Sequence, residues 1–186
     1  MVEVDEELIA AILKGNADEK VSELYLRWHR PISTYFYSFT SNPQDVEDLT
    51  QIVFLKVIKN IKSFRRCKGK FSTWIYTIAR NTALNFVSQK QSQKYHDANP
   101  ILNNSDHIPE NRMLEQEKIE AIRSAINRLK ENQKTALYLR EYQQYSYQEI
   151  AKILDCSEGA VKQLLFRARQ GLMKQLVPYF AKEGMD

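Results

Sequence analysis

The chain has 186 residues, of which 43% are hydrophobic and 11% aromatic, enough to fill a core and too many for a disordered chain. Its net charge is +4, and only 5 Gly and 5 Pro are present. Few segments alternate apolar and polar residues, so we expect an all-α protein. No stretch approaches the roughly 18–20 apolar residues of a membrane span, and the acidic start is unlike a signal peptide. We therefore expect a cytoplasmic protein with no membrane insertion.

Metal and enzyme chemistry are not indicated by the reactive side chains. Cys67 and Cys156 lie far apart and lack the spacing of zinc or redox motifs. The three histidines share no spacing with carboxylates or cysteines that would suit acid–base work, and no glycine-rich loop could cradle a phosphate. We therefore expect neither a cofactor nor an enzymatic activity.

The first half of the chain is expected to form four helices. Apolar periodicity predicts them over residues 5–14, 17–39, 43–62 and 72–89. Pro31 can kink or interrupt the second helix. Together these helices would make one small domain over residues 1–94.

The third helix has the clearest pattern. Apolar residues recur along it at intervals of three and four, and Pro43 suits its first turn. Its opposite edge begins with Asp45, Asp48 and Gln51, where acidic groups also suit the helix dipole.

Charge is distributed unevenly along this half. Residues 1–60 hold 10 acids and 6 Lys or Arg, whereas residues 61–94 hold 8 Lys or Arg and no acid. Such segregation favours a polyanionic partner for the basic segment and a basic protein partner for the acidic one. Within the basic segment, Phe71 and Trp74 alternate with cations and polar groups, as single-stranded nucleic acid requires. The alternative is that these aromatic residues belong to the core, and we expect some of each.

Residues 95–112 lose the helical periodicity and collect Asn, Asp, Ser and Pro, so they are expected to form a flexible linker. A second helical domain is expected over residues 113–186. Its most informative part runs from Tyr147 to Arg169 and reads as two short helices around a tight turn. Asp155 tolerates positive φ in that turn, and Ser157 can cap the following helix.

From Gly159 to Lys182 the chain carries five basic residues and no acid, as expected of a helix that faces DNA. A helical hairpin with a solvated basic face is the plainer alternative.

Several motifs in this order resemble one family. Residues 45–51 (DVEDLTQ), 71–81 (FSTWIYTIARN) and the helix-turn-helix are similar to those of bacterial sigma factors, and more narrowly to the extracytoplasmic-function (ECF) group of the envelope-stress type. The resemblance implies an all-α fold of two domains, sigma domains 2 and 4, joined by the linker. It also implies core RNA polymerase and promoter DNA as partners, and an anti-sigma factor as a further partner.

The resemblance assigns three groups of residues. The helix with Asp45, Asp48 and Gln51 would dock on core polymerase. The −10 element would be captured by Phe64, Arg65, Arg66, Lys68, Lys70, Phe71, Trp74, Arg80 and Asn81. The −35 element would be contacted by Arg140, Ser157, Lys162, Gln163, Phe166, Arg167 and Arg169. Ser88 and the residues after it stand where many relatives have an Arg-rich tail, and Lys162 and Gln163 stand where relatives often have Arg and Ser.

The leading hypothesis is therefore a promoter-specificity subunit that melts the −10 region without hydrolysing a nucleotide. The main alternative is a stand-alone helix-turn-helix regulator that binds palindromic duplex DNA as a dimer. Such a dimer needs an apolar interface stripe, and the sequence leaves no such stripe over.

Overall fold

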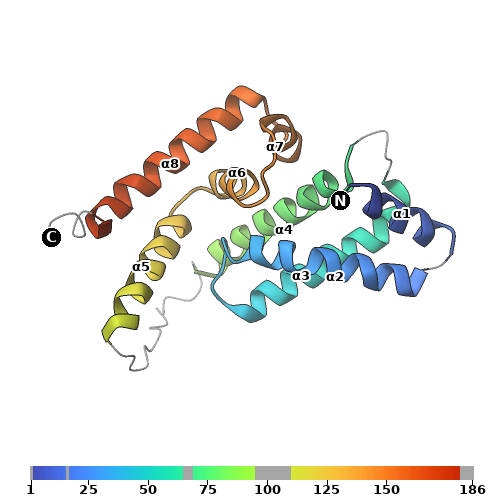
Figure 1. Ribbon diagram of the computed structural model, residues 1–186, viewed down its shortest axis with the longest axis horizontal. Helices are drawn as coiled ribbons and strands as arrows, with labels where there is room; N and C mark the ends of the chain where they lie inside the picture. Colours follow the sequence, from blue (N-terminus) through green and yellow to red (C-terminus); the bar gives the residue numbers. More distant parts are fainter. Residues whose placement is uncertain (1, 16, 65–68, 95–109, 181–186) are drawn as a thin grey trace.

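The computed structural model describes residues 2–15, 17–64, 69–94 and 110–180. Within these ranges the chain folds into eight α-helices and one 3₁₀ turn, with no strand, which confirms the expected all-α class (Figure 1). The elements are α1 (Val2–Leu13), α2 (Ala17–Phe36), α3 (Pro43–Asn60), η1 (Ile61–Ser63), α4 (Phe71–Lys94), α5 (Glu110–Asn127), α6 (Glu131–Glu141), α7 (Tyr147–Leu154) and α8 (Glu158–Phe180). None of the described helices combines the length and the apolar character that a membrane crossing needs.

Helices α1 to α4 form the first unit, and α3 lies against both α2 and α4. The predicted apolar stripe of α3 is buried, and Val53 and Val57 are completely inaccessible. Asn42 begins this helix, because its side-chain oxygen accepts a hydrogen bond of 2.9 Å from the backbone N–H of Gln44. Pro43 follows in the first turn, as the sequence predicts.

Two helices end at residues other than those that the apolar periodicity predicts. Helix α2 continues through Pro31 without interruption and ends at Phe36, three residues before the expected end. Helix α4 extends to Lys94, five residues beyond the expected end. The sequence did not predict this extension, because the residues after Gln89 are polar and carry no apolar periodicity. Helix α5 begins at Glu110, so the last three residues of the expected linker are helical, and residues 95–109 lie outside the described part.

The second unit contains the predicted helix-turn-helix in α7 and α8. A capping box begins α7: the backbone N–H of Ser146 donates to Glu149, whose own N–H donates to the Ser146 hydroxyl. Helix α7 ends at Asp155 in the left-handed conformation, with φ of 52°, and the Ser157 hydroxyl accepts from the N–H of Ala160 at the start of α8. Both turn predictions are confirmed.

The two units pack against each other, and this was not predicted. Helix α7 lies against α4, and Figure 1 shows α6 and α7 beside α4 while α5 and α8 lie farther from α1–α3. One cluster of buried hydrophobic residues extends across both units, from Leu8 in α1 to Leu165 in α8. The molecule therefore has one continuous core where the sequence indicated two.

Candidate nucleic-acid and polymerase interfaces

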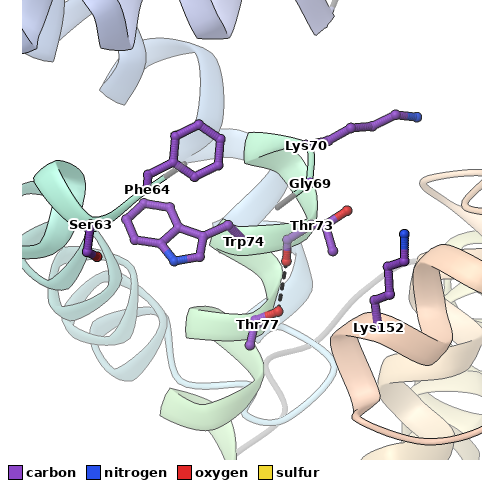
Figure 2. A pocket seen from close by; sticks show the side chains of 8 residues that line it. All are labelled: Ser63, Phe64, Gly69, Lys70, Thr73, Trp74, Thr77 and Lys152. Atoms are coloured by element: carbon purple, nitrogen blue, oxygen red, sulfur yellow. Dashed lines mark hydrogen bonds between the residues drawn. The ribbon is translucent and has the colours of Figure 1, made fainter. Parts of the chain in front are cut away.

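An aromatic cavity of about 280 Å³ lies at the start of α4. Figure 2 shows its two rings, Phe64 and Trp74, close together on one side, with Lys152 of α7 reaching toward Thr73 from the other. The ring centroids are 5.4 Å apart. Among the described residues, the lining comprises Ser63, Phe64, Gly69, Lys70, Thr73, Trp74, Thr77 and Lys152. The two ring planes are tilted by 42° to each other. An aromatic wall of this kind beside hydroxyl and ammonium groups can stack an unpaired base and hold its backbone.

Phe71 supports this wall from beneath. It is only 1% exposed, and its ring makes edge contacts with Trp28 and Phe64 at 5.8 and 5.7 Å. Trp74, by contrast, is partly exposed and lines the cavity. The sequence offered core and nucleic-acid contact as alternatives for this pair, and the structure places Phe71 in the core and Trp74 at the cavity.

Two predicted cations, one just before α4 and one within it, are engaged by the second unit. The Lys70 ammonium donates to Glu149 at 2.7 Å, and Arg80 donates to the side-chain oxygen of Asn132 at 3.1 Å. Asn81 is exposed and accepts a long hydrogen bond of 3.4 Å from Arg80. Arg65, Arg66 and Lys68 lie outside the described residues.

Glu149 is held as a carboxylate by these contacts. Partial burial by itself raises the pKa of Glu149, but the hydrogen bonds from Lys70 and Ser146 outweigh it and lower the pKa to about 2. The side chain therefore remains negatively charged at neutral pH, in contact with Lys70 just before α4.

The acidic edge of α3 has one partly sequestered carboxylate and two exposed side chains. Asp45 accepts hydrogen bonds from Thr40 at 2.9 Å and from Lys90 of α4 at 2.6 Å. Asp48 and Gln51 are exposed, and their hydrogen bonds are local ones to Gln44 and Glu47. Of the three predicted docking residues, Asp48 and Gln51 are therefore exposed, and Asp45 is partly covered.

Sequence reasoning missed an apolar patch beside these residues. Ile52, Leu55 and Ile58 of α3 are 40%, 67% and 45% exposed. The expectation that no apolar stripe is left over is therefore wrong for α3. The available signal was the spacing of these three residues, which places them on the face opposite the buried stripe.

The recognition face of the helix-turn-helix points outward. Lys162, Gln163, Phe166 and Arg167 are all exposed at the beginning of α8, and Phe166 is 61% exposed. Cationic, amide and aromatic groups on one exposed turn can read base edges in a major groove. These four side chains occur together, as the sequence predicts.

The other predicted −35 residues have internal partners. Arg140 donates to the backbone carbonyl of Tyr145 at 2.8 Å and lies 5.0 Å from the centre of the Tyr147 ring. Arg169 donates to Glu141 at 2.6 Å. Ser157 serves as the cap of α8. These three side chains hold the helix-turn-helix together in this structure.

Among the described residues no group of three or more His, Cys, Asp or Glu side chains is placed to hold a metal ion. His96 and His107 lie outside these residues.

Comparison with known proteins matches one family to each of the two units. The Sigma-70 region 2 family matches residues 24–93, and the Sigma-70 region 4 family matches residues 119–172. An ECF RNA polymerase sigma-E factor of Haemophilus influenzae is 32% identical over 94% of this chain and 96% of its own length. The ECF RNA polymerase sigma-E factor of Escherichia coli K12 is 30% identical over 94% of this chain and 95% of its own length.

Solved structures show the same fold. The structure of CnrH in complex with the cytosolic domain of CnrY has a TM-score of 0.67 at 22% identity and covers 92% of this chain and 96% of that one. The sigma factor RpoE of Bartonella quintana, in complex with the anti-sigma factor NepR, has a TM-score of 0.65 at 24% identity, covering 86% and 98%. Sigma factors are transcription initiation factors. On the sequence similarity to the sigma-E factors, this chain belongs to the ECF RNA polymerase sigma factors.

Proposed function

We propose that this chain is an alternative sigma factor of the bacterial cytoplasm. It binds core RNA polymerase, directs it to promoters through the −10 and −35 elements, and promotes melting without hydrolysing a nucleotide. The observation that carries the proposal is the pairing of an aromatic, base-sized cavity in the region 2 unit with an exposed basic recognition helix in the region 4 unit.

The cavity of Phe64 and Trp74 would receive a base of the nontemplate strand from the −10 element. Unstacking a base costs a few kcal/mol, and a pocket that stacks the base and bonds its edge can recover that cost. Thr73 lines the cavity and offers a hydroxyl for the edge, and Lys70 offers a charge for the backbone. Asn81 is exposed outside this lining and would contact a neighbouring part of the strand. Melting would then follow from capture of the base.

The recognition face of α8 would lie in the major groove at the −35 element. Lys162 can donate to O6 and N7 of a guanine, and Phe166 can contact a thymine methyl group. Arg167 adds a further donor for a base edge or a phosphate. Arg140 and Arg169 would orient this face through their contacts with Tyr145 and Glu141.

The outer face of α3 would bind core polymerase. Asp48 and Gln51 supply polar and acidic groups that orient a basic partner, whereas the exposed Ile52 and Leu55 supply area that is buried on docking. The mixture of an acidic end and an apolar centre suits a protein partner better than DNA. We further propose an anti-sigma factor as a regulatory partner, as in the similar complex of RpoE with NepR.

Reconstitution tests the proposal. Purified protein and bacterial core polymerase are tested for initiation on a genomic promoter library. The expected result is a set of specific transcripts that share −10 and −35 motifs. The Lys162→Ala and Arg167→Ala double variant is expected to lose −35-dependent initiation and to keep its affinity for core polymerase. A chain that fails to bind core polymerase but shifts palindromic duplex DNA alone is a stand-alone regulator.

A further inference from the structure

Two cations of the second unit converge on the ring of Tyr147. The Lys162 ammonium of α8 lies over this ring, 5.9 Å from its centre, and the guanidinium carbon of Arg140 in α6 lies 5.0 Å from it. The face of an aromatic ring is electron-rich and attracts a cation placed over it. Because Tyr147 is the first residue of α7, side chains from three helices meet at one ring.

Tyr147 itself is held firmly in place. The residue before it, Ser146, accepts a hydrogen bond of 3.2 Å from the N–H of Glu149, and the Glu149 carboxylate accepts one of 2.9 Å from the N–H of Ser146. The Tyr147 side chain is partly buried and packs against the hydrophobic core. Since its backbone and its ring are both fixed, Tyr147 can support a longer side chain that is not.

Arg140 has a second contact, whereas Lys162 does not. Arg140 is partly buried and donates to the backbone carbonyl of Tyr145 at 2.8 Å. Lys162 is exposed, and within the described part of the chain its ammonium has no hydrogen bond or ion pair. A free lysine side chain occupies many rotamers, and confining it on binding costs free energy. The Tyr147 ring therefore determines the direction of Lys162 in particular.

The two cations beside Tyr147 also favour an anionic partner. Arg140 and Lys162 carry the same charge, and among the described residues neither is paired with a carboxylate. Like charges that share one ring repel each other, and an anion bound near them lowers the electrostatic energy. The phosphate backbone of DNA supplies such an anion beside the base edges.

The other cation of the recognition face has no such support. Arg167 is exposed, and among the residues that the structure describes it has no hydrogen bond, ion pair or aromatic contact. Lys162 and Arg167 thus lie on the same helix and carry the same charge, and they differ in contact with a ring. This difference allows the effect of the ring to be measured against a cation of the same face.

We propose that Tyr147 is a positioning residue for the −35 element: its ring holds the Lys162 ammonium in the direction from which it meets a base edge, and so strengthens the base preference at that position. The inference rests on the proposed function, because it takes α8 as the reader of the −35 element. It adds a side chain outside the recognition helix to those that determine promoter choice.

Orientation before binding increases both affinity and discrimination. Lys162 loses fewer rotamers on contact when the ring already confines it, and it reaches only the acceptors that lie in its direction. A cation–ring contact at an exposed site changes an equilibrium about two- to fivefold. Loss of the ring is therefore expected to reduce the base preference at the position that Lys162 reads by about that factor.

Proton NMR of the full-length free protein tests the contact. Protons over the face of an aromatic ring resonate upfield, so we expect the ε-CH₂ protons of Lys162 upfield of those of Lys174, an exposed lysine of the same helix. Tyr147→Leu should remove this shift, because leucine keeps apolar bulk and lacks the ring. Tyr147→Phe should retain it. Identical Lys162 shifts in wild type and in Tyr147→Leu overturn the contact.

Transcription by the reconstituted holoenzyme tests the role in recognition. The template is a promoter library with a constant −10 element and a randomised −35 element, and the base preference at each position is read from the transcripts. Lys162→Ala identifies the position that Lys162 reads, because the preference is lost there. Tyr147→Leu should reduce the preference at this position about two- to fivefold, and Tyr147→Phe should retain it. An unchanged preference in Tyr147→Leu overturns the proposal.

Double variants separate positioning from a general loss of stability. Tyr147→Leu should have no further effect at that position in a Lys162→Ala background, and its full effect in an Arg167→Ala background. The matched control is Tyr142→Leu, which removes a ring that is 69% exposed and stacks on Tyr138 at 5.4 Å. It should keep all preferences of the wild type. A loss in Tyr147→Leu that is equal at every position overturns the positioning role.

These outcomes are separable from the proposed function. The NMR measurement contains neither polymerase nor DNA, so the ring contact can be found in a chain that fails in reconstitution. If Lys162→Ala changes no base preference of an active holoenzyme, Lys162 does not read the −35 element, and the role proposed for Tyr147 is wrong as well. If Lys162→Ala removes a preference that Tyr147→Leu leaves intact, the role of Tyr147 alone is wrong.

Discussion

At the scale of single residues, hydrogen bonds at the helix ends determine where the two helices of the helix-turn-helix begin and end. Ser146 and Glu149 begin α7, Asp155 ends it, and Ser157 begins α8. Each of these residues satisfies a backbone group that a helix end leaves without a partner. The turn angle, and with it the exposed face of α8, depends on these few side chains.

Asp155 is expected to be replaceable by glycine but not by alanine. At φ of 52° the Cβ of any side chain lies close to the backbone carbonyl, and the short polar side chain of aspartate can offset this strain by bonding locally to the backbone. Alanine keeps the strain and loses the offset, so Asp155→Ala is expected to be about 1 kcal/mol less stable, whereas glycine has no Cβ and tolerates this conformation. Urea denaturation of the two variants measures the difference. Equal stability of Asp155→Ala and Asp155→Gly would contradict a strained position.

Glu149 is expected to make the free energy of unfolding decrease at acidic pH. Its pKa is lowered from 4.5 to about 2, so its contribution to folding is complete above pH 4.5 and is lost as the pH falls toward 2. The difference in unfolding free energy between wild type and Glu149→Gln should therefore be constant near neutral pH and shrink below pH 4.5. Urea titrations at several pH values measure it, and a pH-independent difference would show that Lys70 and Ser146 do not hold the carboxylate.

At the scale of the helix, α3 separates the residues that pack in the core from those proposed to bind polymerase. Its buried stripe, with Val53 and Val57, anchors the first unit, while Leu55 points to solvent. Exposed apolar residues that gather in one patch are typical of interaction surfaces, so Leu55 with Ile52 and Ile58 supports the proposed docking surface.

Loss of Leu55 is expected to weaken binding to core polymerase. Leu55→Ser removes apolar area worth about 1–2 kcal/mol on docking, or roughly five- to thirtyfold in Kd. Leu13→Ser is the matched control, since Leu13 is also exposed, at 47%, but lies at the end of α1. Fluorescence anisotropy with labelled protein measures both. A Kd that is the same for the two variants would remove α3 from the docking surface.

At the scale of the whole molecule, the continuous core couples two units that the family matches treat separately. Tyr35 and Tyr138 belong to different units, yet their rings are 5.3 Å apart and neither is exposed beyond 5%. Because each ring is buried partly by the other, unfolding of either unit exposes both rings to water.

Coupled units are expected to unfold together. Thr135 of α6 is 1% exposed, and its hydroxyl is 2.9 Å from the hydroxyl of Tyr35 in the first unit. Scanning calorimetry of the wild-type chain should give one transition, and Thr135→Glu should give two, because the charge separates the units without entering either helical core. Asn127→Glu, which puts the same charge on an exposed position of α5, should behave as wild type. Two transitions in the wild-type chain would show that the contact is too weak to couple them.

The sequence by itself determined the helices of the first unit to within five residues, the helix-turn-helix, the cap at Ser157 and the positive φ of Asp155. These features arise from residues three or four apart along the chain, so their pattern can be read locally. The resemblance to sigma factors grouped Lys162 with Arg167 on the predicted recognition face, and both side chains are exposed in α8.

Only the tertiary structure decided which of the proposed contact residues are engaged by the protein itself. Arg169 pairs with Glu141 across 28 positions, Lys90 with Asp45 across 45, and Lys70 with Glu149 across 79. No local pattern records such pairs, because their distance is set by how the helices pack. The packing of α7 against α4 arises in the same way, from tyrosines that are close only after the chain has folded.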